Sequence, residues 1–553
     1  MRLQKSQISI WREVVTALGA AVGIATLAAA GATARVAATQ GYWKAGYHRL
    51  VFATLLHFFD RWAALAAALT LALVLISRAA QQLGCPGAPR AGSRVVRAAL
   101  VLLIVLAAAR VLTVLDVWLA ARGPSVVLIS VDTLRADRLG AYGYNLPTSP
   151  TIDSQLAARG VTFETCYSQS PKTTPSHMTM LTSLYPCVHG IPLWKETAPG
   201  PVLNPAVHTL AEVLKNAGYA TAGFTGRGNV HRSRGFGQGF DVYKHGNQLE
   251  RATEWMTRHR RRKFFLFFHT YAVHDPYVPP ERLTALFDDG YEGPVRVAVD
   301  RLREGVGGWG QAHRIFWASV DSKDPRDTHF VQRLYDAAIR HMDEAAIGTL
   351  LDHLETLGLA DDTLVVLTSD HGEAFGEHGA FLHDDLYGET LRVPLILRFP
   401  GRLPTGQRIT QRARVIDVMP TILDLVEVPA PPLQQGRSLV PVLRGDVAGK
   451  DVWDATSEYS DNASGRVFES LRHGHLTYIV DRSEEQLFDH AQDSEERRNL
   501  AAERAADLQT VRNELAGWQQ ECRRLAAEFG PRAEVVAPSD DTVRQLRALG
   551  YVN

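Results

Sequence analysis

Two apolar segments, far apart in the chain, each end in side chains of the kind that bind metal ions. Val126–Val131 has the length and composition of a buried strand and is followed by Asp132, while Leu364–Thr368 is followed by Asp370 and His371. The carboxyl ends of strands in an open α/β sheet face the crevice in which ligands bind. A lone Asp after a strand is usually a cap, but two such ends favour an α/β fold with Asp132, Asp370 and His371 as metal ligands.

A hydroxyl residue, Thr173, lies between these two strands in the segment Lys172–His177. A hydroxyl nucleophile combined with strand-end metal ligands is typical of enzymes that cleave phosphate or sulfate esters. Lys172 adds positive charge beside this hydroxyl or is an ordinary solvated surface lysine. We therefore predict that Thr173 is the nucleophile, and that its oxygen also binds the metal.

From about Pro124 onwards, strand-like and helix-like segments alternate, which predicts an α/β domain with a mostly parallel sheet flanked by helices. Further strands are expected at Tyr219–Thr225, Lys263–His269 and Val393–Arg398, and helices at Val207–Gly218 and Leu334–Leu357. The segment between Pro280 and Phe330 looks irregular, as lids and binding loops often do.

The composition divides the chain into three predicted parts. Residues 1–122 are apolar and form a membrane anchor, residues 123–450 form the catalytic domain, and residues 451–553 form a smaller α+β subdomain. In the last part, Val467–Leu471 and Leu476–Val480 are expected to be antiparallel strands, and Ala501–Phe529 a helix. No internal repeat interrupts this organisation.

Three apolar stretches in the first part are candidates for membrane-spanning helices, for which roughly 20 residues are needed. They are Val14–Ala34, Trp62–Ser77 and Ala98–Ala120. The first is also compatible with a signal peptide, although two more apolar stretches follow it. Basic residues before the first stretch and between the second and third favour the cytoplasm, so three spans place the catalytic domain outside it, whereas an even number reverses this.

The overall charge gives no indication of a particular class of partner, and the cysteines are too few to determine the fold. The chain has 59 Lys and Arg against 59 Asp and Glu, so its charge gives no indication of a nucleic-acid partner. Its four cysteines are too few for a disulfide scaffold. Cys166 and Cys187 flank Thr173 and are either a disulfide in an extracytoplasmic domain or two buried thiols.

Several ordered motifs accompany these residues. They are Ser130–Asp132 with Leu139–Gly143, Thr173–His177 with Leu181–Ser183, Leu334–Asp336, Thr368–Glu373 with Gly376–Gly379, Arg392–Leu395, Asp417–Thr421, and Leu487–Asp489 with Asn499–Leu500. In these motifs the chain resembles the sulfatases and related members of the alkaline phosphatase superfamily, from Val126 to the C-terminus. The resemblance implies their α/β fold and an ester hydrolase or transferase activity.

The chain departs from the sulfatase pattern at the nucleophile. Sulfatases have Cys or Ser at the position of Thr173 and convert it to formylglycine, whose second hydroxyl expels the sulfate. A threonine alkoxide has no second oxygen, so its ester must be attacked by water or by an acceptor hydroxyl. The superfamily's phosphodiesterases and phosphotransferases work in this way. The arginine of the sulfatase motif is replaced by His177.

The resemblance also implies a change at the metal site. Sulfatases use an all-oxygen set suited to calcium, with two Asp after the first strand and Asp-Asn after the later one. Here the corresponding pairs are Asp132-Thr133 and Asp370-His371. The imidazole favours zinc or manganese over calcium, although calcium remains possible.

Two more histidines are candidates for the active site. His274 matches the family's histidine that touches the transferred group, and His383 resembles a histidine of the phosphoethanolamine transferases. Together with His177, these residues are predicted to position the substrate or move protons. His269, His378 and His189 are expected to be structural or to support the residues of the site from behind.

The favoured hypothesis is a membrane-anchored, metal-dependent hydrolase or transferase of phosphate esters that works through a covalent Thr173 intermediate. The first alternative is a sulfatase that lacks formylglycine. The second is an inactive binding protein on the same fold. A site near a membrane makes a lipid head group or an envelope glycan the expected substrate.

Overall fold

The computed structural model describes residues 123–191, 201–226, 229–305, 307–445, 454–461, 466–481 and 484–530. The chain divides into two units between Ala121 and Arg122, and all of these residues belong to the second. The three predicted membrane spans lie outside the described residues. Within the described ranges, no helix combines the length and the apolar character that crossing a bilayer requires.

The core of the second unit is a large mixed sheet with the strand order β10-β2-β9-β6-β1-β5-β3-β4, and β11 also pairs with β2. Its strands are β1 (Ser125–Val131), β2 (Val161–Tyr167), β3 (Ala220–Thr225), β4 (Val242–His245), β5 (Phe264–Thr270), β6 (Thr363–Thr368), β9 (Arg392–Arg398), β10 (Gln407–Ile409) and β11 (Ala413–Arg414). The α/β class is confirmed. Most neighbouring strands run parallel, as predicted, but the sheet is mixed because β9 runs antiparallel to both β2 and β6.

The centre of the sheet places the two predicted ligand-bearing strands side by side. β1 lies between β5 and β6 and is parallel to both. In this register Ser130 pairs with Thr368 of β6, so both strands end at the same level. Asp132 and Asp370 therefore leave the sheet at one edge.

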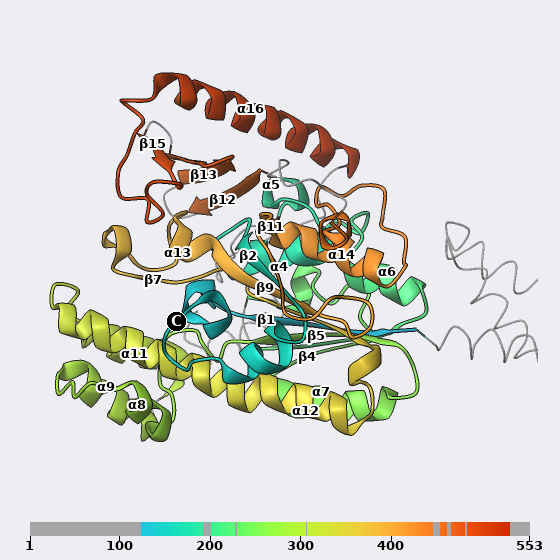
Figure 1. Cartoon of the computed structure of the whole chain (residues 1–553), viewed down its shortest axis with the longest axis horizontal. Helices are drawn as coiled ribbons and strands as arrows, with labels where there is room; N and C mark the ends of the chain where they lie inside the picture. Colours follow the sequence, from blue (N-terminus) through green and yellow to red (C-terminus); the bar gives the residue numbers. More distant parts are fainter. Residues whose placement is uncertain are drawn as a thin grey trace, which may run out of the picture. The chain divides into compact units, whose positions relative to one another are not determined.

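Alternate residues of β1 face two separate hydrophobic layers, as the pleat of a strand requires. Val126 and Leu128 pack in the layer that contains α4, α6 and α14, whereas Val127 and Ile129 pack in the layer that contains α7, α11 and α12. Figure 1 shows these helices on opposite faces of the sheet. Their bounds are α4 (Thr173–Thr182), α6 (Leu210–Asn216), α14 (Val418–Leu425), α7 (Gln248–His259), α11 (Pro325–Met342) and α12 (Thr349–Thr356).

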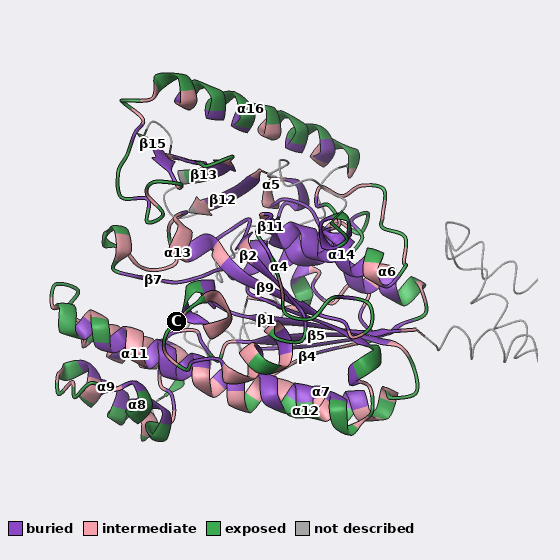
Figure 2. Ribbon diagram, viewed as in Figure 1, coloured by how far each residue is buried: buried purple, intermediate pink, exposed green. Residues whose placement is uncertain are grey.

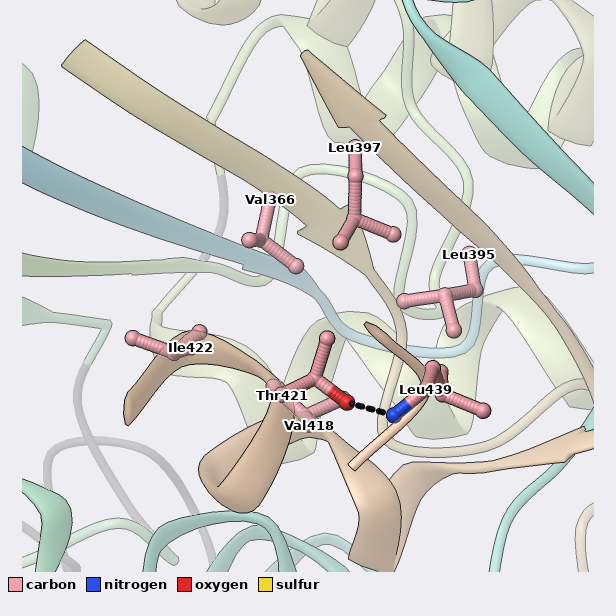
Figure 3. A pocket seen from close by; sticks show the side chains of 7 residues that line it. All are labelled: Val366, Leu395, Leu397, Val418, Thr421, Ile422 and Leu439. Atoms are coloured by element: carbon pink, nitrogen blue, oxygen red, sulfur yellow. Dashed lines mark hydrogen bonds between the residues drawn. The ribbon is translucent and has the colours of Figure 1, made fainter. Parts of the chain in front are cut away.

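Helix α14 packs closely against the sheet. Figure 3 shows Thr421 of α14 beneath Val366 of β6 and Leu395 of β9. The backbone N–H of Leu439 donates a hydrogen bond of 2.9 Å to the Thr421 hydroxyl. The gap that these side chains line has no room for a water molecule, so α14 is fixed firmly on the sheet.

The segment between Pro280 and Phe330 differs from the prediction. It contains α8 (Glu281–Phe287), α9 (Pro294–Arg303) and α10 (Gly308–Ala318), and α11 begins at Pro325. The helices are short and carry glycine, proline and charges at their ends, which gave the segment its irregular appearance. The single helix predicted for Leu334–Leu357 is divided by a π-helical turn, η5 (Asp343–Gly348), between α11 and α12.

The C-terminal part forms a second, antiparallel sheet with the strand order β12-β13-β14-β15, as predicted. Its strands are β12 (Ala455–Asp461), β13 (Arg466–His473), β14 (Leu476–Asp481) and β15 (Glu484–Asp489), and α16 (Ala505–Glu528) covers it. Figure 2 shows α16 with a buried inner side and an exposed outer side.

A buried arginine ties this small sheet to the main domain. Arg472 of β13 is 1% exposed, and its guanidinium is 3.4 Å from the Glu496 carboxylate. It donates a hydrogen bond of 3.1 Å to the carbonyl of Leu386 and lies over the ring of Tyr167 at 4.4 Å. A buried charge with several partners of this kind is costly to disrupt.

The remaining short elements complete the described chain. They are α5 (Pro186–His189), α13 (Gly388–Leu391), α15 (Val440–Leu443), β7 (Ala374–Phe375), β8 (Phe381–Leu382), the π-helical η3 (Ile152–Ala157), and the 3-10 turns η1 (Ala136–Arg138), η2 (Gly140–Tyr142), η4 (Arg232–Arg234), η6 (Ala360–Asp362), η7 (Glu377–Gly379) and η8 (Val415–Asp417).

Candidate active site

The structure brings together the three residues predicted as metal ligands from the strand ends. Asp132 follows β1, and Asp370 and His371 follow β6. All three side chains are fully buried. One potential ligand atom from each lies within 4.8 Å of the others. This spacing is small enough for a single ion to touch all three side chains.

The two carboxylates in this group are poorly compensated by the protein alone. Asp132 Oδ1 and Asp370 Oδ2 are buried and accept no hydrogen bond. Burial raises the pKa of Asp132 to about 7, and burial together with the nearby Asp132 raises that of Asp370 to about 8. Buried anionic groups normally have partners or coordinate a metal. The donor set therefore fits a divalent cation.

His371 is held in the tautomer that a metal ligand needs. Its Nδ1 is 2.9 Å from the carbonyl oxygen of Gly372, to which it donates. Nε2 is then left with its lone pair, 3.4 Å from Asp370 Oδ2 and 3.9 Å from Asp132 Oδ1. Burial lowers the pKa of His371 well below its usual value, which keeps the ring neutral. Only glycine fits at position 372, because a Cβ there would lie 2.1 Å from the carbonyl oxygen of Glu389.

Thr173 is the first residue of α4, and its side chain reaches the same group of ligands. Its hydroxyl lies 3.4 Å from His371 Nε2, and the residue is 2% exposed. The free backbone N–H groups at the start of a helix favour negative charge in front of them. The predicted nucleophile therefore lies where an anionic ester group would be stabilised.

His177 lies one helical turn after Thr173 and is completely buried. Its Nδ1 is 2.8 Å from the carbonyl oxygen of Thr173, and its Nε2 is 2.9 Å from the hydroxyl of Ser130. Burial lowers its pKa to about 4. Because both ring nitrogens are engaged, this arrangement favours a role in fixing α4 against β1 over the predicted proton transfer.

His274 follows β5 and is held by a buried carboxylate. Its Nδ1 is 3.0 Å from Asp275 Oδ1. Burial alone lowers the pKa of His274, but Asp275 outweighs this effect and raises it to about 10. The other Asp275 oxygen pairs with His313 and accepts a hydrogen bond of 2.9 Å from the Trp317 indole, so α10 helps to orient the histidine. His274 is therefore cationic at neutral pH.

His383 has the opposite electrostatic character. Its ring centre lies 4.4 Å from that of His371, and its Nδ1 is 2.9 Å from Glu373 Oε1. Tyr277 donates a hydrogen bond of 2.8 Å to the other oxygen of Glu373. Burial, followed by the charge of Lys172, lowers the pKa of His383 well below its usual value. This ring is neutral, with Nε2 directed away from Glu373.

The site opens on the side of these two histidines. The side chains of His274 and His383 are 8% and 15% exposed, whereas those of His371 and Glu373 are fully buried. Their ring centres are 5.7 Å apart. These two side chains are therefore more accessible than His371 and Glu373.

Some neighbouring residues were missed by the sequence analysis or had no role assigned. Glu373 and Asp275 position the two histidines, and Ser130 anchors His177. His269, predicted to be structural or to support the site, places Nε2 3.3 Å from Asp132 Oδ2 and so contacts a predicted metal ligand. Glu373 belongs to the same sequence motif as Asp370 and His371. This proximity in the sequence was the one feature that could have indicated a role for Glu373 in the site.

The other histidines expected to be structural lie outside the ligand group. His378 stacks on Tyr387 at 3.7 Å and pairs with Glu389 at 2.8 Å. His189 Nε2 is 3.2 Å from the carbonyl oxygen of Pro175 and 3.2 Å from the Thr179 hydroxyl. His189 therefore helps to hold α5 against α4.

Lys172 and the cysteines settle two alternatives left open by the sequence. Lys172 is 6% exposed, so the interpretation as a solvated surface lysine is wrong. Cys166 is a buried free thiol, and Cys187 is a partly buried one. The structure therefore shows thiols at these two positions and no disulfide between them.

Comparisons with known proteins find family models and relatives of similar sequence. A family model described as Sulfatase matches residues 124–428, and one described as N-sulphoglucosamine sulphohydrolase, C-terminal, matches residues 376–523. An N-acetylglucosamine-6-O-sulfatase from Bacteroides thetaiotaomicron is 25% identical over 61% of this chain and 74% of its own length. Arylsulfatase K from Mus musculus is 24% identical over 69% of this chain and 77% of its own length.

Solved structures share the fold. A putative sulfatase from Bacteroides fragilis matches with a TM-score of 0.60 and 21% identity, covering 74% of this chain and 97% of its own. A phosphonate monoester hydrolase of Agrobacterium radiobacter matches with a TM-score of 0.57 and 22% identity, covering 73% of this chain and 96% of its own.

Proposed function

Because the chain belongs to the sulfatase family and is a hydrolase of that family, we propose that it hydrolyses sulfate esters with Thr173 as the nucleophile. The observation that carries this proposal is the buried Thr173 hydroxyl 3.4 Å from His371 Nε2. The names of several relatives support sulfate as the transferred group. The glycan in the name of N-acetylglucosamine-6-O-sulfatase supports a sulfated glycan as the substrate.

A divalent metal is part of the proposal. Asp132, Asp370 and His371 would hold it, with the Thr173 hydroxyl beside them. Such an ion lowers the pKa of a neighbouring hydroxyl and neutralises charge on the ester. Sulfatases usually bind calcium, but the imidazole of His371 leads us to propose zinc or manganese.

The proposed reaction has two displacements at sulfur. The Thr173 oxygen attacks the sulfur, the ester bond breaks, and the alcohol leaves. Water then attacks the sulfur of the Thr173 ester, breaks the bond to Thr173 Oγ and releases inorganic sulfate. Because a threonine carries one side-chain oxygen, release by collapse to an aldehyde is excluded for Thr173.

His274 and His383, both largely buried, suit opposite roles in proton transfer. His274 is cationic, so it can donate a proton to the departing alcohol. His383 is neutral, and with Nδ1–H donating to Glu373 its Nε2 can accept a proton from the attacking water. Environments that separate two pKa values in this way mark an acid and a base.

A second candidate function is the hydrolysis or transfer of phosphate esters. Thr173 and His371 favour it, because a plain hydroxyl beside an imidazole-containing metal site suits transfer by a displacement that does not need formylglycine. The same residues would perform it, with phosphorus in place of sulfur.

One comparison separates the two functions. The full chain is loaded with zinc, manganese or calcium, and kcat/KM is measured for an aryl sulfate, an aryl phosphate monoester and an aryl phosphate diester. Sulfate hydrolysis that exceeds both phosphate reactions and disappears in Thr173→Ala supports the proposal. Faster phosphate turnover moves the assignment to the second candidate.

We also propose that residues 1–122 anchor the protein in a membrane with the catalytic domain outside the cytoplasm. The apolar composition of this part supports the anchor, as does the start of the family match at residue 124, directly after it. The expected result is that the full chain stays with the membrane in alkaline carbonate and that protease added outside the cell digests the catalytic domain. A domain protected until the cell is lysed would contradict this orientation.

A further inference from the structure

Lys172 directly precedes the predicted nucleophile and is almost buried. Its side chain is 7% exposed, and it forms an ion pair with the carboxylate of Asp384. Its ammonium group lies 4.9 Å from the centre of the Tyr459 ring of β12. Lysine is rarely buried to this extent unless a partner compensates its charge, so the strength of the pair with Asp384 decides how well this charge is compensated.

Its partner lies at the open side of the site. The Asp384 side chain is 63% exposed and directly follows His383 in the chain. Exposed carboxylates contribute little to ion pairs, because water screens them. Asp384 is therefore a weak and displaceable partner for a cation held in a nearly buried place.

Several carboxyl groups lie around the proposed nucleophile, so a positively charged side chain there would help to bind an anionic substrate. Asp132, Asp370 and Glu373 are buried within the site or next to it, whereas the ester group of a substrate is an anion. Lys172 is bonded in the chain to Thr173, and its partner Asp384 directly follows His383, so the ion pair lies beside the site. The N-terminus of α4 favours negative charge at the same place.

We propose that Lys172 binds an oxygen of the substrate's anionic group and that Asp384 is its partner only while the substrate is absent. The proposal rests on an anionic ester as substrate, and it holds for sulfate and phosphate alike. It predicts that Asp384 competes with the substrate for Lys172. Removal of the lysine and removal of the aspartate therefore have opposite effects on anion binding.

The test is a double-mutant cycle on the metal-loaded full chain, with Lys172→Met, Asp384→Asn and the double variant. The Kd of inorganic sulfate and of inorganic phosphate is measured by calorimetry, together with KM and kcat for the ester. We expect Lys172→Met to weaken anion binding and raise KM about tenfold or more, as expected for a lost hydrogen bond to a charged group. Asp384→Asn should tighten anion binding, and the double variant should behave like Lys172→Met.

Two further variants keep the test sharp. Lys172→Arg retains the charge and should keep most of the anion affinity, so it separates the loss of charge from misfolding. Lys215 of α6 forms another lysine–aspartate pair, 2.7 Å from Asp241, in which both side chains are nearly half exposed. Lys215→Met removes this pair and should leave anion binding unchanged.

A purely structural ion pair gives a different pattern. It predicts that Lys172→Met and Asp384→Asn lower the melting temperature alike and leave the anion Kd unchanged, which would overturn the inference. If no ester is hydrolysed but anion binding follows the expected cycle, the proposed function fails and the role of Lys172 stands. If ester turnover is normal and Lys172→Met leaves both KM and Kd unchanged, the function stands and the role of Lys172 is wrong.

Discussion

Replacement of Asp370 by asparagine should stabilise the metal-free protein and abolish its stabilisation by metal. Asp370 Oδ2 accepts no hydrogen bond, so placing the amide nitrogen of asparagine at this position removes no hydrogen bond. In the metal-free folded protein the pKa of Asp370 rises from 3.8 to about 8. At about 1.4 kcal/mol per pH unit, ionising this carboxyl costs about 6 kcal/mol of folding free energy.

The pH dependence follows from the direction of this shift. A carboxyl whose pKa is higher in the folded than in the unfolded state binds its proton more tightly when folded. Stability of the metal-free protein therefore falls as the pH rises from about 4 to about 8. Because asparagine carries no charge, Asp370→Asn avoids this cost, and we expect it to raise the unfolding free energy of the metal-free protein by up to about 6 kcal/mol at pH 9.

The assay is chemical or thermal unfolding of the full chain between pH 5 and pH 9, in chelator and in saturating metal. Metal at about 100 times its Kd should stabilise the wild type by about 3 kcal/mol and should have little effect on Asp370→Asn. Asp361→Asn, an exposed change just before β6, is the matched control and should follow the wild type. The reasoning is refuted if metal-free Asp370→Asn is no more stable than the wild type at pH 9, or if metal stabilises both equally.

Three further predictions concern the nucleophile and the packing around the site. Thr173→Ser keeps the hydroxyl and should retain activity within about tenfold, whereas Thr173→Ala should lose about a thousandfold or more in kcat. Equal activity of the two variants would exclude Thr173 as the nucleophile. Arg472→Met leaves a buried carboxylate without its partner and should lower the unfolding free energy by about 3 to 5 kcal/mol, whereas Arg524→Met, at an exposed pair, should change it by under about 1 kcal/mol. Burial alone lowers the pKa of His378, but Glu389 raises it to about 9. The stabilisation that His378→Gln removes should therefore be present in full below pH 6.5 and disappear as the pH rises through 9. A stability difference between the two proteins that does not change with pH would contradict this ion pair.

The sequence was most informative where the chemistry is local. The apolar run of β1 and the polar residues after it placed Asp132, and the same pattern placed Asp370 and His371. The direction of β9 was not predictable, because a strand buried on both faces has the same composition in either direction. The ion pair between Lys172 and Asp384 joins residues far apart in the chain, and no local pattern reports such a contact.

The helices after β5 were missed for a different reason. α8, α9 and α10 are short, so their apolar faces give little periodic signal. Their role is nevertheless specific, because α10 supplies the groups that hold Asp275 and so orient His274. The proposed nucleophile, in contrast, stood out in the sequence because Thr173 and His177 both depart from the sulfatase motif.

The most direct test of the central claim is to trap the covalent intermediate on Thr173. The metal-loaded full chain is mixed with an aryl sulfate, or in parallel with an aryl phosphate, quenched in acid within a single turnover, and digested for mass spectrometry. We expect the peptide containing Thr173 to carry the transferred sulfo or phosphoryl group, and this modification to be absent from Thr173→Ala. An unmodified Thr173, together with full turnover in Thr173→Ala, would contradict it.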